Sequence, residues 1–259
     1  MPISSSHFSS RPASWVLLDE FASIGHRRNA TTAASLTSAR GTVQVSFELV
    51  GPPEVSRWFV NFSGREEREC KRKPQIINAV DSLVLMRMAV FLEGGRVFDY
   101  FVYRAAPGKP SLNLIPGPYP KIYLARQIGI LPCGDKGQHY AVVFPARRVE
   151  ARMDYEMHIF SSECWAWSTK VANVVIDRET GCYDIVKHKS CKVVSAGGSC
   201  LAWIDMWRGV LLCNVLDKDP VLRLLQWPVP PPQNVCIQCS FNTGCNVEQW
   251  RGQTCGGDL

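Results

Sequence analysis

The most constraining feature of the sequence is a stretch near its C-terminal end, residues 193–216, which has the pattern of two apolar strands around a tight turn. Successive side chains of a strand point to opposite faces, so Leu201, Trp203 and Asp205 share one face of the first strand. In the second strand the residues that share a face are Leu211, Cys213 and Val215 on one side and Val210, Leu212 and Leu216 on the other. A Gly-Gly turn precedes the first strand, and residues 205–209, DMWRG, have Asp and Gly where a short loop requires them. The stretch predicts a β-hairpin, which is a scaffold and carries no chemistry by itself.

Short strand patterns recur along the rest of the chain. Residues 42–50, TVQVSFELV, alternate strictly between apolar and polar side chains, which is typical of a strand with one face in water. Residues 80–91 would also fit a helix, but a strand is favoured because residues 97–103 follow across a Glu-Gly-Gly turn and would complete a hairpin. Residues 22–40 lack a clear period and predict a loop, as do the charged residues 64–74. The other predicted strands begin or lie at residues 15–21, 57–62, 111–116, 128–131, 140–144, 155–160, 165–171 and 222 onwards.

Many short strands broken by Gly and Pro predict an all-β fold of the sandwich, barrel or propeller type. A loose repeat of aromatic-rich strands that end in Pro favours the propeller. We therefore expect a β-propeller-like array of short antiparallel strands, and the sequence does not decide whether its ring is complete or incomplete. The predicted organisation is a disordered leader over residues 1–14, the propeller-like domain over residues 15–232, and an atypical, disordered, cysteine-containing segment over residues 233–259.

The composition limits the classes of protein to which the chain could belong. Its 259 residues are 46% hydrophobic and 20% charged, which is normal for a globular protein and argues against general disorder. The net charge of +6 is spread along the chain apart from residues 65–73, so nucleic acid is not expected as a partner. No segment has 18 consecutive apolar residues, so a membrane is not expected either. The Ser-rich N-terminus lacks the apolar core of a secretory signal, so the eleven cysteines are expected to be reduced. The predicted location is the cytoplasm or nucleus, and secretion is not expected.

Four cysteines near the C-terminus raise the hypothesis of a zinc site. Cys236 and Cys239 have the spacing of a zinc knuckle, and Cys245 and Cys255 could supply two further thiolates. The second pair is spread over ten positions and no His lies nearby, so unpaired thiols in an unstructured segment are favoured over a metal site. The sequence indicates no cofactor.

Two other functional interpretations are weaker than their structural alternatives. A Cys-His hydrolase could use Cys164 or Cys200 with His158 or His188, but nothing in the sequence brings these groups together, and no known hydrolase motif is present. A nuclear-localisation patch at residues 71–73, KRK, is offset by three nearby glutamates, which favours a solvated loop.

Several blocks resemble one protein family. Residues 197–216, GGSCLAWIDMWRGVLLCNVL, followed by PVLR at 220–223 and WPVP at 227–230, closely resemble the hallmark of a large plant family, expanded in grasses, that is known only as domain of unknown function 1618 (DUF1618). WVLLD at 15–19 is similar to the family's start, and YEMHIFSS at 155–162 with WAWS at 165–168 is similar to its middle block. Residues 233–259 depart from the family's pattern. The hallmark positions, with a structural role, are Gly197, Gly198, Trp203, Asp205, Gly209, Cys213 and Pro228.

The resemblance implies a propeller similar to those that accompany plant F-box proteins. No F-box-like helical module precedes Trp15, so a ligase-adaptor role does not carry over. What it implies is a non-enzymatic module for protein–protein interaction, with an unidentified protein partner. The alternatives are a hydrolase with a central pocket and a truncated, non-functional family member. An incomplete ring would leave unpaired strand edges. The chain could therefore be a monomer or could associate through those edges, and the sequence does not decide between these two states.

Overall fold

The chain is described by a computed structural model over residues 15–63, 72–92, 95–119, 125–134, 137–147, 154–175 and 188–228. Within these ranges the regular structure consists of strands and one short 3₁₀ helix, η1 (Ala125–Gln127), which confirms the prediction of an all-β fold. Residues 1–227 form one compact unit and residues 228–259 another, and the fold below is that of the first unit. The predicted leader, most of the 64–74 loop and the 233–259 segment lie outside the described residues.

The first module is a five-stranded sheet with the order β1–β5–β4–β3, in which β2 also pairs with β5. Its central strands confirm two predictions, because the strictly alternating stretch forms β4 and pairs antiparallel with β5, with Val45 opposite Val60. The prediction of a loop over residues 22–40 was wrong in part, because β2 and β3 lie within it. The bounds are β1 Leu17–Leu18, β2 Ser23–Ile24, β3 Ala33–Leu36, β4 Thr42–Glu48 and β5 Val55–Phe62.

The second module is a four-stranded antiparallel sheet in which the strands follow one another in sequence order. The bounds are β6 Gln75–Val80, β7 Leu83–Leu92, β8 Gly95–Arg104 and β9 Ser111–Leu114. The strand interpretation of residues 80–91 is confirmed, since β7 and β8 form the predicted hairpin. Both faces of β7 are buried, which explains why its sequence has an apolar run where a half-exposed strand would alternate.

The third and fourth modules each contain four antiparallel strands, again in sequence order. A short parallel ladder between β13 and β17, with Val174 opposite Leu222, joins them into one eight-stranded sheet. The third module has β10 Gly129–Cys133, β11 His139–Arg147, β12 Tyr155–Ser161 and β13 Ala166–Val175. The fourth module has β14 Lys192–Ser195, β15 Cys200–Asp205, β16 Gly209–Asn214 and β17 Val221–Leu225.

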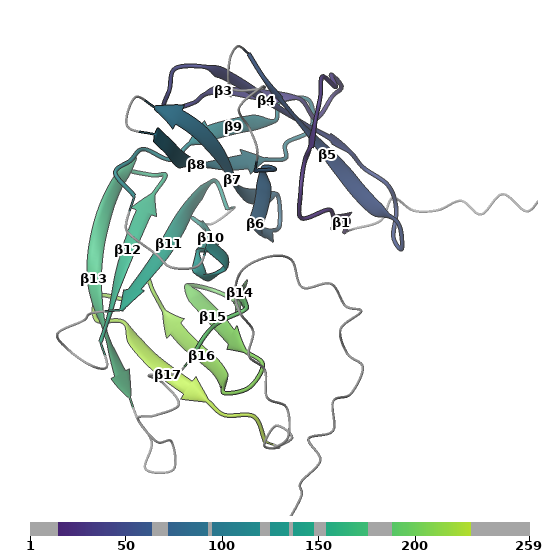
Figure 1. Cartoon of the computed structure of the whole chain (residues 1–259). Coiled ribbons are helices and arrows are strands. Elements are labelled where there is room, and N and C mark those ends of the chain that lie inside the picture. Colours follow the sequence, from purple (N-terminus) through teal and green to yellow (C-terminus); the bar gives the residue numbers. More distant parts are fainter. Residues whose placement is uncertain are drawn as a thin grey trace, which may run out of the picture. The chain divides into compact units, whose positions relative to one another are not determined.

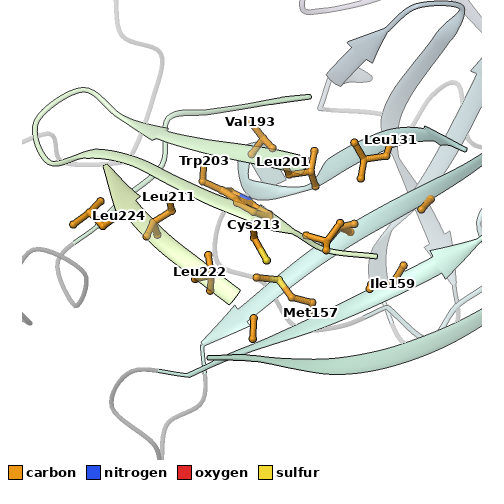
Figure 2. Close-up of a cluster of buried hydrophobic side chains, with 14 residues drawn as sticks. Leu131, Met157, Ile159, Val193, Leu201, Trp203, Leu211, Cys213, Leu222 and Leu224 are labelled. Atoms are coloured by element: carbon orange, nitrogen blue, oxygen red, sulfur yellow. The ribbon is translucent and has the colours of Figure 1, made fainter. Parts of the chain in front are cut away.

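Three hydrophobic clusters join the faces of consecutive modules in the order of the sequence. Figure 1 shows the strands that make up these modules. The first cluster joins the first and second modules around Trp58 and Phe101, which are fully buried. The second joins the opposite face of the second module to the third, around Val102 and Phe144. The third cluster fills the space between the third and fourth modules, where Met157 and Ile159 face Trp203 and the residues beside it (Figure 2).

The leading strands of the last three modules lie close together. β6 contacts β10 and β14, and β10 contacts β14, although 117 positions separate the starts of β6 and β14 (192 − 75). The side-chain amide of Asn78 on β6 donates to the carbonyl of Val193 on β14 over 3.2 Å. Each of these modules therefore directs its first strand toward the same region and its later strands away from it.

Candidate functional site

The hallmark hairpin forms β15 and β16, with the alternation of faces that the sequence predicts. Leu201 lies opposite Cys213, and Trp203 lies opposite Leu211, all on the face that packs against the third module. Trp203 is 3% exposed, and its indole N–H donates to the carbonyl of Gln127 over 2.9 Å. Burial raises the pKa of the Cys213 thiol to about 12, so this thiol stays protonated at neutral pH. The inner face of the hairpin is structural.

Asp205 organises the turn between the two strands. Its carboxylate accepts hydrogen bonds from the backbone N–H groups of Trp207, Arg208 and Lys189, at 2.8, 3.2 and 2.7 Å. The indole of Trp227 donates to the Asp205 backbone carbonyl over 3.0 Å. The three bonds from backbone N–H groups satisfy a nearly fully buried carboxylate, so Asp205 acts as a turn acceptor, the role expected of Asp in a tight loop.

The three hallmark glycines occupy turn positions that a side chain would strain. Gly197, Gly198 and Gly209 have φ values of +94°, +55° and +112°. Nothing lies near the first two, whereas a Cβ on Gly209 would collide with the carbonyl oxygen of Leu225. The fourth module therefore needs glycine at position 209 for both backbone conformation and space. Pro228 lies just after Trp227 and is exposed.

His188 lies beside this turn as a buried neutral imidazole. Its Nε2 is 3.3 Å from the carbonyl oxygen of Gly209, which can only accept, so Nε2 carries the hydrogen. Burial lowers the pKa of His188, an effect that the nearby Asp205 carboxylate opposes and that Arg147 and Arg208 reinforce. The hydrolase hypothesis placed a catalytic base here, but the imidazole is engaged with a backbone carbonyl.

The stability of the fold is expected to fall as the pH falls through the ordinary His range. The folded state binds the His188 proton less tightly than the unfolded state does, so unfolding is favoured as the pH falls from the unfolded pKa toward the lower folded value. Chemical denaturation between pH 7.5 and pH 5.5 should therefore show a loss of stability that is smaller in His188→Gln. An equal loss in both proteins would show that other groups cause it.

The other proposed catalytic and metal-binding residues are not brought together in the described part of the chain. His158 Nδ1 is 3.1 Å from the hydroxyl of Thr169, and its Nε2 is 3.6 Å from the carboxylate of Glu156. Cys164 lies in the turn after β12, and Cys200 begins β15. Within the described ranges no three His, Cys, Asp or Glu side chains are grouped to hold a metal ion, and Cys236, Cys239, Cys245 and Cys255 lie outside those ranges.

The outer face of the fourth module, the face turned away from the third module, is the candidate interaction surface. Because side chains alternate along a strand, the residues between those of the buried inner cluster point to this outer face. The registers of the strand pairs align these outer side chains in rows across the sheet. One row is Ile204, Val210 and Leu225, and the next is Val194, Ala202 and Leu212. All except Ala202 are partly or largely exposed, and Leu225 is 53% exposed.

Two exposed apolar side chains extend this surface at one end. Met206, in the β15–β16 turn, is 65% exposed, and Trp227, after β17, is 38% exposed. The sequence analysis did not predict this surface, although it contains a signal for it: Val210 and Leu212 alternate with the buried Leu211 and Cys213, which makes both faces of the strand apolar. The pattern could not show which of the two faces is covered.

The outer face of the first module, at the other end of the stack, carries both polar and apolar side chains. The side chains of β4 on this face are those of Thr42, Gln44, Ser46 and Glu48. The segment before β3 also lies along it, since the Ser46 hydroxyl donates to the carbonyl of Arg27 over 2.6 Å. The Arg27 guanidinium is 3.3 Å from the Glu48 carboxylate and lies over the ring of Phe59. The same face also carries Leu36 of β3, which lies opposite Thr42, and Val55 of β5, and these side chains are 59% and 53% exposed.

Asp99 is a fully buried carboxylate with an incomplete set of partners. Its Oδ2 accepts the backbone N–H of Ser38 over 2.7 Å, while Oδ1 has no hydrogen-bond partner among the described residues. Burial raises the pKa of Asp99, and the hydrogen bonds with Ser38 oppose that rise. The folded state therefore holds this proton more tightly than the unfolded state, and stability is lost as the pH rises from the unfolded pKa to the folded one.

Removing this charge should stabilise the protein at neutral pH. Asp99→Asn retains an oxygen that can accept from Ser38 and no longer buries a carboxylate, so we expect a gain of about 1–2 kcal/mol in the free energy of unfolding at pH 7. Urea denaturation would measure it, with the exposed Asp219→Asn as a control that changes stability little. A destabilised Asp99→Asn would mean that the ionised carboxylate is compensated in the fold.

The described ranges contain no helix with the length and apolar character needed to cross a membrane.

Comparison with known proteins identifies one relationship. The model of a family described as protein of unknown function, DUF1618, matches residues 203–255. The match begins at Trp203 in the hallmark hairpin and includes residues 234–255, so the expectation that the chain departs from the family's pattern beyond Gln233 was wrong. No curated protein and no solved structure matches. The match thus supports the resemblance to DUF1618, a family without an assigned function, over the C-terminal part of the chain.

Proposed function

We propose that the chain is a non-enzymatic protein-binding module and that its stacked modules are blades of an incomplete β-propeller. A propeller blade is a four-stranded antiparallel sheet with its strands in sequence order, and neighbouring blades pack face to face around an axis. The second, third and fourth modules have this strand order, and hydrophobic clusters join their faces. The mutual contacts of β6, β10 and β14 support a common axis lined by the first strand of each blade.

The observation that carries the binding function is the apolar outer face of the fourth module. A sheet face in water normally carries polar side chains. The fourth module instead presents Ile204, Val210, Leu212 and Leu225, with Met206 and Trp227 beside them. Contiguous exposed apolar surface on a protein marks an interaction site.

Affinity capture with three purified proteins tests this function. The wild-type chain is compared with Leu212→Glu, which places a charge in the middle of the apolar face, and with Thr42→Glu, which introduces the same charge on the outer face of the first module. Thermal melting first verifies that all three proteins fold. We expect quantitative mass spectrometry to identify proteins that wild type and Thr42→Glu retain equally and that Leu212→Glu retains at least about tenfold less.

A second variant controls for the possibility that Leu212→Glu weakens capture by disturbing the fold. Leu225 is more exposed than Leu212, so Leu225→Glu should leave the fold intact while also weakening capture. Identical sets of captured proteins for wild type and both face variants would contradict a binding function for this surface.

A further inference from the structure

The charges on the apolar face have one sign. Val193 is buried in the inner cluster, so alternation places its neighbour Lys192 on the outer face, and Arg223 lies there between Val221 and Leu225. The registers place Lys192 in the row of Ile204 and Arg223 in the row of Leu212. Lys192 lies on the first strand of the module and Arg223 on its last strand, β17, where it is opposite Val175 of β13. Both cations are exposed, and the described strand residues of this face include no carboxylate.

We propose that the outer face of the fourth module binds a polypeptide segment whose apolar side chains are flanked by Asp or Glu. The inference rests on the proposed binding function and adds the chemistry of the partner. Apolar side chains of the segment would cover the rows around Val210 and Leu212, and its carboxylates would approach Lys192 and Arg223 on the first and last strands of the module. Complementary charges at the rim of an interface select the partner and its register. A second copy would bring its own Lys192 and Arg223 to the same surface, and the net charge of +6 also opposes self-association.

Selection from a random 16-residue peptide library displayed on phage tests the proposal. The full chain is the immobilised target, and Leu212→Glu serves for counter-selection, so that clones that bind elsewhere are removed. We expect the enriched peptides to carry apolar residues and an excess of Asp and Glu over Lys and Arg. Synthetic peptides from these clones are then titrated into wild type, Leu225→Glu and the double variant Lys192→Gln with Arg223→Gln.

The double variant Lys192→Gln with Arg223→Gln tests whether acidic groups of the peptide contribute to binding, separately from whether the face binds a peptide. We expect the double variant to bind about three- to tenfold more weakly at low salt and the difference to shrink at 0.5 M salt, because exposed charges are screened. Leu225→Glu should weaken binding at both salt concentrations. Thr42→Glu is the control and should bind as wild type does.

The possible failures are distinguishable. If no clone depends on Leu212, the proposed function of this face fails together with the inference. If clones depend on Leu212 but show no excess of acidic residues and bind the double variant as tightly as wild type, the inference alone is overturned. Sedimentation that shows a concentration-dependent dimer abolished by Leu212→Glu would also overturn it, because the occupant would then be a second copy.

Discussion

Replacing Trp203 by alanine is expected to cost about 3–5 kcal/mol of the free energy of unfolding. The indole lies in the cluster between the third and fourth modules, and its removal leaves a cavity among residues such as Leu201 and Leu211 (Figure 2). The carbonyl of Gln127 also loses its indole donor. Because a domain is stable by only about 5–15 kcal/mol, the variant should be close to unfolded at physiological temperature, and urea denaturation at 25 °C would measure the loss.

Two variants divide this cost into its causes. Trp203→Phe retains most of the apolar volume and loses the hydrogen bond, so it should cost about 1–2 kcal/mol. Trp165→Ala removes an indole that is 49% exposed and should cost less than about 1 kcal/mol. A similar loss for Trp203→Ala and Trp165→Ala would refute the packing of the third module against the fourth that the structure describes.

Gly209→Ala is expected to destabilise the fold by about 3 kcal/mol or more, although it adds a single methyl group. The residue has a φ of +112°, which costs a non-glycine residue about 1–3 kcal/mol. The new Cβ would also collide with the carbonyl oxygen of Leu225 on the paired strand β17, so the backbone of β16 or β17 has to move. The shift should also affect the carbonyl that His188 contacts.

The matched control for this prediction is Gly197→Ala. Gly197 has a similar φ of +94°, but no atom lies near the position of its Cβ, so the substitution adds backbone strain without a collision. Denaturation curves should therefore show a distinctly larger loss for Gly209→Ala than for Gly197→Ala. Equal losses would mean that strain alone is responsible and that β17 does not lie so close to the turn.

Local patterns in the sequence were sufficient for the fold class and for several individual strands. The alternation of residues 42–50 predicted β4, and the flanking turn chemistry predicted the β15–β16 hairpin with Asp205 as a turn acceptor. These features depend on neighbours in the sequence, namely on strand periodicity and on the residues that a tight turn requires. The short strands β3 and β6 were missed, because four residues of small or polar character, or six residues beside a charged loop, give no clear period.

Two features of the candidate site depend on contacts between distant segments and could not be read from a local pattern. The strand 209–214 is apolar on both faces, and only the packing of the third module on one of them shows that Leu212 and Val210 lie on the side that no other module of the described residues covers. Likewise, the incomplete hydrogen bonding of Asp99 arises where β8 meets the backbone of Ser38, 61 positions earlier. The sequence by itself determined that the chain makes short antiparallel strands with defined turns. The tertiary structure decided how those sheets stack, and thereby which apolar face lies on the surface, because face-to-face packing is set by long-range contacts that strand periodicity does not encode.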